Sequence, residues 1–265
     1  MLAQTRAPAP FRGASSRRPD VSANFFGKAK TVTTGRITGR APRLADPVDL
    51  KKTGFRYDAA NLRWVRDDRK ANEGGMEEIT ATPISGTSYV VWPVMHTTLV
   101  TKGLKSVTPE EAQQLQKQGW TIVDVRLASE YEKEHAEGAV SVPAFRFTAG
   151  TSAADTFKKV AMAIGFAMRA TERNPEFTQE AAQALGKGSK ILVMCSIGGT
   201  LDTLLDLRAG VKAPIRDAER SFGRESRALK ACYELIKSGW NPNNIFWVDG
   251  GLQQWRYNGL PVIKK

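Results

Sequence analysis

Three short, mainly apolar runs separated by helical signals constrain the fold of this chain most strongly. The runs occupy residues 121–125, 191–194 and 245–248. A strand that is apolar at successive positions is buried on both faces, as in a parallel sheet covered by helices. Helical patterns lie beside these runs, at residues 108–119, 176–185 and 225–238. Strands that alternate with helices predict an α/β domain with a mostly parallel central sheet flanked by helices.

The basic residues of the chain are concentrated near its beginning. Residues 1–45 contain nine Lys and Arg residues and one acid, Asp20, and so carry +8 of the formal net charge of +12. The small excess left for the rest of the chain gives little support for nucleic-acid binding. A segment rich in Arg, Ser, Thr and Ala, nearly free of acids and without an apolar stretch, is typical of an organelle transit peptide. A disordered basic tail on a cytosolic protein is the alternative.

These features divide the chain into three parts. Residues 1–45 are expected to be a disordered transit peptide, residues 46–104 an N-terminal extension, and residues 105–265 the α/β domain. In the extension, alternating apolar and basic residues on either side of residues 58–61 predict a β-hairpin. The apolar run 89–104 is expected to cover an edge of the α/β domain. No apolar run reaches the length of a membrane span.

Cys195 is the main candidate for chemistry. It directly follows the apolar run 191–194 and precedes a loop that contains Gly198 and Gly199. Glycines allow backbone N–H groups to turn toward a group carried on the sulfur. A thiol held as the thiolate can attack electrophiles, and the alternative is a buried structural cysteine. The chain has one other cysteine, Cys232, and two cysteines are too few for a disulfide framework. The sequence also contains no Cys/His cluster of the kind that binds a metal. A reducing compartment therefore fits this cysteine content best.

Motifs on both sides of Cys195 resemble the signatures of rhodanese-like domains. These signatures are Asp-x-Arg, Glu-Tyr, Gly-His-Ile-x-Gly-Ala and Pro before the cysteine, and Gly-Gly, Trp and Gly-x-Pro after it. The matching residues are Asp124, Arg126, Glu130, Tyr131, His135, Gly138, Ala139, Pro143, Gly250, Gly251, Trp255, Gly259 and Pro261. Cys195 falls where the family has its active cysteine, whereas Thr200 stands where many single-domain members have arginine. The resemblance covers residues 105–265. The whole chain also resembles plant and algal chloroplast rhodanese-like proteins, which favours the chloroplast, in the stroma or at the thylakoid.

The resemblance implies sulfane-sulfur transfer by Cys195. Its thiolate would take sulfur from a small donor and pass it to a thiol or cyanide acceptor, with no cofactor and no metal. The substrate- and anion-binding loop would comprise Ser196, Ile197, Gly198, Gly199 and Thr200, supported by Asp124, Arg126, Arg224, Ser226 and Arg227. In this fold the Asp124–Arg126 pair more often holds the loop framework, and structural roles are also expected for His135 and Cys232. A phosphatase of the Cys-x5-Arg type is disfavoured because Leu201 occupies the arginine position.

An insertion, residues 201–224, separates the cysteine loop from the helix that follows it directly in most of the family. If the insertion returns at residues 224–227, a helix N-terminus lies behind the cysteine and basic side chains could steer anionic donors. If it does not return, activity would be weak or absent. The competing hypothesis is therefore a catalytically weak or inactive module that docks a chloroplast protein or a thylakoid surface. An amphipathic helix predicted at residues 155–170 could contribute to such peripheral contact. Neither a nucleic-acid partner nor a transmembrane span is expected.

Overall fold

The computed structural model describes the main part of the α/β domain and several separate segments. The described residues are 37, 39–44, 55–58, 63–66, 80–81, 89–147, 171–205, 215–216 and 222–265. The chain forms two compact units, residues 1–36 and 37–265, and all described residues belong to the second. The helix predicted at residues 155–170 and the first 36 residues of the predicted leader lie outside the described residues.

Five parallel strands form the central sheet, in the order β5-β14-β11-β6-β8. Their bounds are β5 (Lys105–Val107), β6 (Thr121–Asp124), β8 (Val140–Ser141), β11 (Ile191–Met194) and β14 (Ile245–Val248). The three apolar runs form the three inner strands, which are the ones with a neighbour on each side. The prediction of an α/β fold with a parallel sheet is therefore confirmed. Because β11 lies in the middle of the sheet, Cys195, which directly follows β11, lies between the carboxyl ends of β6 and β14.

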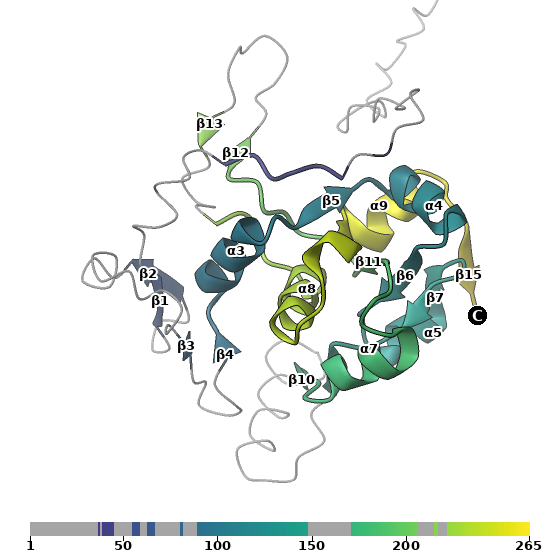
Figure 1. The fold of residues 1–265 in the computed structure, drawn as a ribbon, viewed down its shortest axis with the longest axis horizontal. Helices are drawn as coiled ribbons and strands as arrows, with labels where there is room; N and C mark the ends of the chain where they lie inside the picture. Colours follow the sequence, from purple (N-terminus) through teal and green to yellow (C-terminus); the bar gives the residue numbers. More distant parts are fainter. Residues whose placement is uncertain are drawn as a thin grey trace, which may run out of the picture. The chain divides into compact units, whose positions relative to one another are not determined.

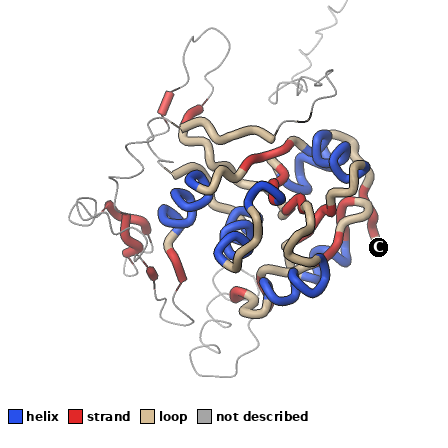
Figure 2. The backbone as a smooth tube through the Cα atoms, viewed as in Figure 1, coloured by secondary structure: helices blue, strands red, loops and turns tan. Residues whose placement is uncertain are grey.

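Helices cover both faces of this sheet (Figure 2). One core lies under α4 (Pro109–Lys117) and α9 (Gly251–Tyr257), and the other under α3 (Trp92–Thr101), α7 (Phe177–Leu185) and α8 (Arg227–Lys237). Leu192 and Met194 of β11 belong to the first core. Ile191, Val193 and the adjoining Cys195 belong to the second. This alternation follows from the two-residue period of a strand, and it places the cysteine on the α8 side of the sheet.

Side chains cap the first turns of two of these helices. At α4, Thr108 Oγ1 accepts a hydrogen bond from Glu111 N at 3.2 Å, and the Glu111 carboxylate accepts one from Thr108 N at 2.9 Å. This capping box satisfies N–H groups that the first helical turn leaves unpaired. Ser226 caps α8, with its Oγ accepting from Leu229 N at 3.1 Å. A short helix, α5 (Ala128–Lys133), follows β6.

Short antiparallel pairs complete the described structure. They are β1 (Phe55–Asp58) with β2 (Arg63–Arg66), β3 (Thr80–Ala81) with β4 (Tyr89–Val90), β7 (Glu134–Ala136) with β15 (Val262–Lys264), β9 (Phe145–Phe147) with β10 (Thr171–Arg173), and β12 (Leu204–Leu205) with β13 (Ile215–Arg216). A 3-10 turn, η2 (Pro242–Asn244), precedes β14. The pairing of β1 with β2 confirms the hairpin predicted in the N-terminal extension.

The apolar run at residues 89–104 contains α3, which packs against α8 (Figure 1). Most of the residues of α3 are buried, so it requires partners around much of its surface. The edge beside β5 is paired by Arg40, which exchanges backbone hydrogen bonds with Ser106 at 2.7 and 3.0 Å. Among the described helices, none combines the length and the apolar character needed to cross a membrane.

Candidate functional site

Cys195 begins a loop that α9 holds in place. Cys195 is buried, with 1 % of the residue exposed. Its carbonyl oxygen accepts a hydrogen bond from Leu252 N at 2.8 Å, and the next carbonyl, of Ser196, accepts one from Gln253 N at 3.0 Å. Both donors belong to the first turn of α9, where N–H groups have no helical partner. The N-terminus of α9 therefore binds loop carbonyls and fixes the position of the cysteine backbone.

Two consecutive glycines let the loop turn tightly against its neighbours. Gly198 has a φ of +71° and Gly199 a φ of +76°, in the left-handed region that favours glycine. A Cβ at Gly198 would lie 2.6 Å from both Val248 O and Gly250 N, and a Cβ at Gly199 would lie 2.7 Å from the Cβ of Ser226. The loop is thus packed between the end of β14 and the start of α8, and a larger residue at either glycine would displace it.

Part of the loop backbone is already hydrogen-bonded. Gly199 N donates to Ile197 O at 2.8 Å, and Thr200 N donates to Arg224 O at 3.0 Å. In the described part of the chain, no carbonyl accepts from the N–H groups of Ser196, Ile197 or Gly198. Within the loop, the N–H groups that lack such a carbonyl partner are therefore those of residues 196–198.

The insertion returns to the end of the cysteine loop. Thr200 and Arg224 exchange two backbone hydrogen bonds, with N···O distances of 3.0 and 2.8 Å. Two residues later, Ser226 Oγ donates to Gly198 O at 2.6 Å while it caps α8. The N-terminus of α8, with its positive dipole end, therefore lies against the loop. The sequence predicted a helix N-terminus behind the cysteine if the insertion returned at residues 224–227, and in the structure it returns there.

Helix α3 binds both ends of the insertion. His96 Nε2 forms a 2.9 Å hydrogen bond with Leu201 O, and Trp92 Nε1 donates to Phe222 O at 2.9 Å. The His96 ring packs edge-on against Trp92 and Phe222. Burial lowers the pKa of His96 to about 4, although the bond to Leu201 acts in the opposite direction. The ring is therefore neutral near physiological pH and donates its Nε2 proton to the carbonyl.

Arg227, the first residue of α8, brings a positive charge to the loop. Its Nη2 donates to Ser196 Oγ at 3.1 Å and to Glu130 Oε1 at 2.9 Å, and its Nη1 donates to Glu130 Oε2. Hydrogen bonding to Glu130 raises the pKa of Arg227, against the effect of burial, and the charges of Glu130 and Cys195 raise it further. The guanidinium is thus within electrostatic reach of the sulfur.

A family model for the rhodanese-like domain matches residues 108–258. The chain belongs to the rhodanese-like domain family. It is 34 % identical over 222 residues to the chloroplastic rhodanese-like domain-containing protein 14 of Arabidopsis thaliana, covering 83 % of this chain and 92 % of that protein. It is 25 % identical over 158 residues to the chloroplastic thiosulfate sulfurtransferase 16 of the same plant, covering 59 % and 91 %. The solved rhodanese-like domain of an Anabaena sp protein matches 60 % of this chain and 79 % of its own, with a TM-score of 0.36 and 16 % identity.

In this rhodanese-like domain, Asp124 and Arg126 bind each other. Arg126 Nε and Nη2 donate to the Asp124 carboxylate at 2.9 and 2.7 Å, and Nη2 also donates to Glu134 O. Both side chains are buried. A bidentate pair of this kind is rigid, so it ties the end of β6 to β7 beside the cysteine loop.

The other cysteine and the second histidine of the rhodanese-like domain lie in structural surroundings. Cys232 is fully buried in α8, and burial raises the pKa of its thiol, with a further contribution from Cys195. A thiol that resists deprotonation is a poor nucleophile. His135 Nδ1 forms a 2.8 Å hydrogen bond with Tyr131 O, and the two rings stack with centroids 3.9 Å apart.

Sequence reasoning missed several partners of the site. Arg40 Nη2 lies 3.1 Å from Asp202 Oδ2 and 3.6 Å from Asp249 Oδ2, and Arg43 N donates to Asp202 Oδ1 at 2.7 Å. Both arginines had been counted only as leader charge. The Glu-Tyr signature identified Glu130 as a family residue, but it did not predict that Glu130 binds Arg227. For His96, no local pattern indicated the contact with the insertion.

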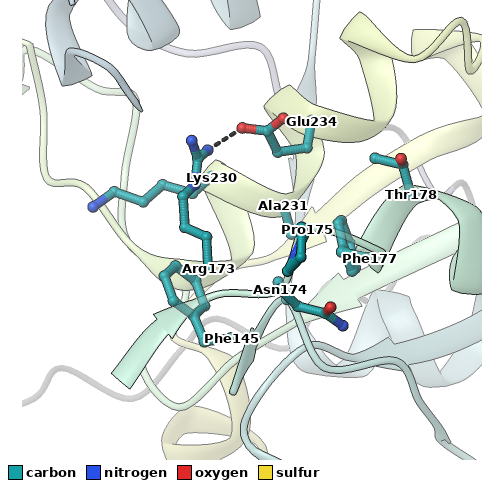
Figure 3. Close-up of a pocket in the computed structure, with 10 residues that line it drawn as sticks. Phe145, Arg173, Asn174, Pro175, Phe177, Thr178, Lys230, Ala231 and Glu234 are labelled. Carbon is teal, nitrogen blue, oxygen red and sulfur yellow. Dashed lines mark hydrogen bonds and ion pairs between the residues drawn. The ribbon is translucent and has the colours of Figure 1, made fainter. Parts of the chain in front are cut away.

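A cavity of about 200 Å³ lies beside α8 and does not include Cys195 (Figure 3). Its lining includes Arg173, Asn174, Phe177, Lys230 and Glu234. Arg173 pairs with Glu234 across the cavity, and Lys230 lies 3.2 Å from Glu225 Oε2. The positive charges of this lining are therefore already neutralised. Among the described residues, the cavity lining included, no group of three or more His, Cys, Asp or Glu side chains could hold a metal ion.

Proposed function

We propose that this rhodanese-like domain is a sulfurtransferase in which Cys195 carries sulfane sulfur as a persulfide. One observation carries the proposal: the Thr200–Arg224 pair gives the cysteine loop the N-terminus of α8 and the Arg227 guanidinium in spite of the insertion. Family membership supports it, as does the similarity to a protein named as a thiosulfate sulfurtransferase.

The proposed reaction has two steps. The Cys195 thiolate attacks the outer sulfur of thiosulfate, the donor S–S bond breaks, and sulfite leaves with the electron pair. With mercaptopyruvate the thiolate attacks the thiol sulfur, the C–S bond breaks, and pyruvate leaves as the enolate, which takes up the thiol proton. Cys195 then carries a persulfide with an anionic outer sulfur. A cyanide or thiol acceptor attacks that sulfur, and Cys195 leaves as the thiolate, so the enzyme returns to its starting state. The chemistry requires groups that stabilise negative charge on sulfur at both stages.

The loop supplies those groups from three sources. The N–H groups of residues 196–198 are available to an anion, the α8 dipole points at the loop, and Arg227 adds a guanidinium whose charge is partly offset by Glu130. Ser226 and Arg224 act by fixing the loop, Ser226 through its side chain and Arg224 through its backbone. Asp124 and Arg126 supply the rigid frame at the end of β6.

We place this activity in the chloroplast, because the relatives at 34 % and 25 % identity are both chloroplastic proteins. Residues 1–45 fused to a fluorescent reporter should direct it into plastids. Retention of the reporter in the cytosol would contradict the proposed targeting. The stroma and the thylakoid surface are then separated by fractionation of the isolated organelle.

The decisive measurement is thiocyanate formation from cyanide, with thiosulfate or mercaptopyruvate as donor. Wild-type protein should be active, Cys195→Ser should fall to background, and the matched control Cys232→Ala should retain activity. Mass spectrometry of donor-treated protein should find one added sulfur atom on Cys195. Equal rates for wild type and Cys195→Ser would refute the proposal.

The 1 % exposure of Cys195 favours one other candidate, a catalytically weak or inactive module that docks a chloroplast protein or a thylakoid surface. A sulfur this well covered must be uncovered before a donor can reach it. Absence of both thiocyanate and the persulfide, together with sedimentation of the protein with thylakoid membranes, would support this alternative.

A further inference from the structure

Glu130 fixes the Arg227 guanidinium in place. Its carboxylate accepts two hydrogen bonds from Arg227 and a third, at 3.1 Å, from Leu127 N in the turn that opens α5. Arg126, which precedes Leu127 in the chain, donates hydrogen bonds to the Asp124 carboxylate from both its side chain and its backbone N–H. A continuous set of contacts therefore runs from the end of β6 to Glu130, Arg227 and finally Ser196. The carboxylate is thus held by three hydrogen bonds, and the chain leading to it starts from the buried Asp124–Arg126 pair.

The same contact changes the charge of the site. Arg227 is the cation bonded to the cysteine loop, and Glu130 neutralises it at hydrogen-bond distance. Burial acts to raise the pKa of Glu130, but the hydrogen bonds and charge of Arg227 outweigh it, so the pKa is lowered and the carboxylate is ionised at neutral pH. An anionic donor that approaches Arg227 is therefore repelled by Glu130, and the repulsion of a dianion is twice that of a monoanion.

We propose that Glu130 sets the charge class of the sulfur donor, disfavouring dianions such as thiosulfate relative to monoanionic organic donors such as 3-mercapto-2-oxo acids. The inference rests on the proposed sulfurtransferase function. Glu130 acts through Arg227 as a positioning residue and does not itself touch the reacting sulfur. Its side chain is 32 % exposed and that of Arg227 is 30 % exposed, so salt screens the discrimination only in part.

The test compares the two donors in wild type, Glu130→Gln and a matched charge control. Glu130→Gln removes the charge but keeps an oxygen that can accept from Arg227. The control is Glu134→Gln, which removes a carboxylate that pairs with Arg256 and Lys264 at the C-terminal side of the domain. In Glu130→Gln, the KM for thiosulfate should fall by about fivefold more than the KM for mercaptopyruvate, the ratio expected for one extra unit of charge at partly screened distances. Glu134→Gln should leave the ratio of the two KM values at its wild-type level.

Several outcomes separate this inference from the proposed function. An inactive wild type would refute the sulfurtransferase function itself. An active wild type with an unchanged KM ratio in Glu130→Gln, or a loss of kcat alone for both donors, would overturn the charge-selection role. If Glu130→Gln does not fold, Glu130→Ala decides, because it removes the same charge without placing an amide beside Arg227. The ratio of the KM for thiosulfate to that for mercaptopyruvate should be lower in Glu130→Ala than in wild type, and an unchanged ratio would overturn the inference.

Discussion

Thr200 and Arg224 close the insertion at its base by exchanging both of their backbone hydrogen bonds. The chain therefore re-enters the domain where it left, and Ser226 and Arg227 reach the cysteine loop. Among the described residues of the insertion, those at its base belong to the core of the domain, as Leu201 and Phe222 show.

The first prediction concerns the base of the insertion. Leu201 is fully buried in the α3–α8 core, whereas Leu204 in β12 is only half-buried. Leu201→Ala should lower the free energy of unfolding by about 2–5 kcal/mol, because it leaves a cavity. The same change at Leu204 should cost about 1 kcal/mol or less. Urea denaturation monitored by circular dichroism measures both, and equal costs would mean that the base is not part of the core.

A second prediction concerns the fit between α9 and the cysteine loop. A Cβ at Gly251 would lie 2.2 Å from Cys195 O, whereas a Cβ at Gly259 would meet no atom within 4 Å, and both glycines have positive φ. Each Gly→Ala change should cost about 1–2 kcal/mol of backbone strain. Only Gly251→Ala should also displace Cys195 and reduce the sulfur-transfer rate, by about 10- to 100-fold. Equal rates in the two variants would show that the position of the loop does not depend on this contact.

Local signals in the sequence were sufficient for most of the fold. The apolar runs identified the inner strands because strands covered on both faces need no polar positions. The Thr108–Glu111 capping box and the alternation around residues 58–61 depend on neighbours in the chain, so they could be recognised without a tertiary structure. The position of α3 could not, because nothing in the run 89–104 tells whether its apolar surface faces a sheet or another helix.

For the candidate site, too, the local pattern could be recognised from the sequence and the long-range contacts could not. Cys195 and the glycines after it are contiguous, so their pattern was visible at once. In contrast, the partners that complete the site come from distant parts of the chain: Glu130 for Arg227, and His96 for Leu201. Pairs of this kind arise only when the fold brings α5 beside α8 and α3 beside the insertion, and no spacing in one sequence encodes them.

A third prediction concerns the segment 37–44, which was assigned to the leader from its charge. Arg40 pairs with Ser106 at the sheet edge, and Arg40 and Arg43 both bind Asp202, whose side chain is 10 % exposed. A truncation that begins at residue 37 should retain wild-type stability. One that begins at residue 45 should lose about 1–3 kcal/mol, because a largely buried carboxylate is left without its partners. Chemical denaturation of the two proteins compares them directly, and identical stabilities would show that this segment does not support the domain.

The last prediction is a pH dependence of stability that originates at His96. Because burial lowers its pKa from 6.5 to about 4, the unfolded chain binds a proton between these values that the folded protein does not. Stability due to this group is therefore complete above pH 6.5 and is lost as the pH falls toward 4. Between about pH 7 and about pH 5, the free energy of unfolding should fall by about 2 kcal/mol on account of His96 alone.

His96→Gln isolates this contribution, because glutamine keeps an N–H donor for Leu201 O but does not titrate in this range. Urea denaturation at both pH values should therefore give a smaller decrease in stability for His96→Gln than for wild type. A decrease of the same size in wild type and His96→Gln would mean that His96 is protonated as easily in the folded state as in the unfolded chain, and the α3–insertion contact would then be open to solvent.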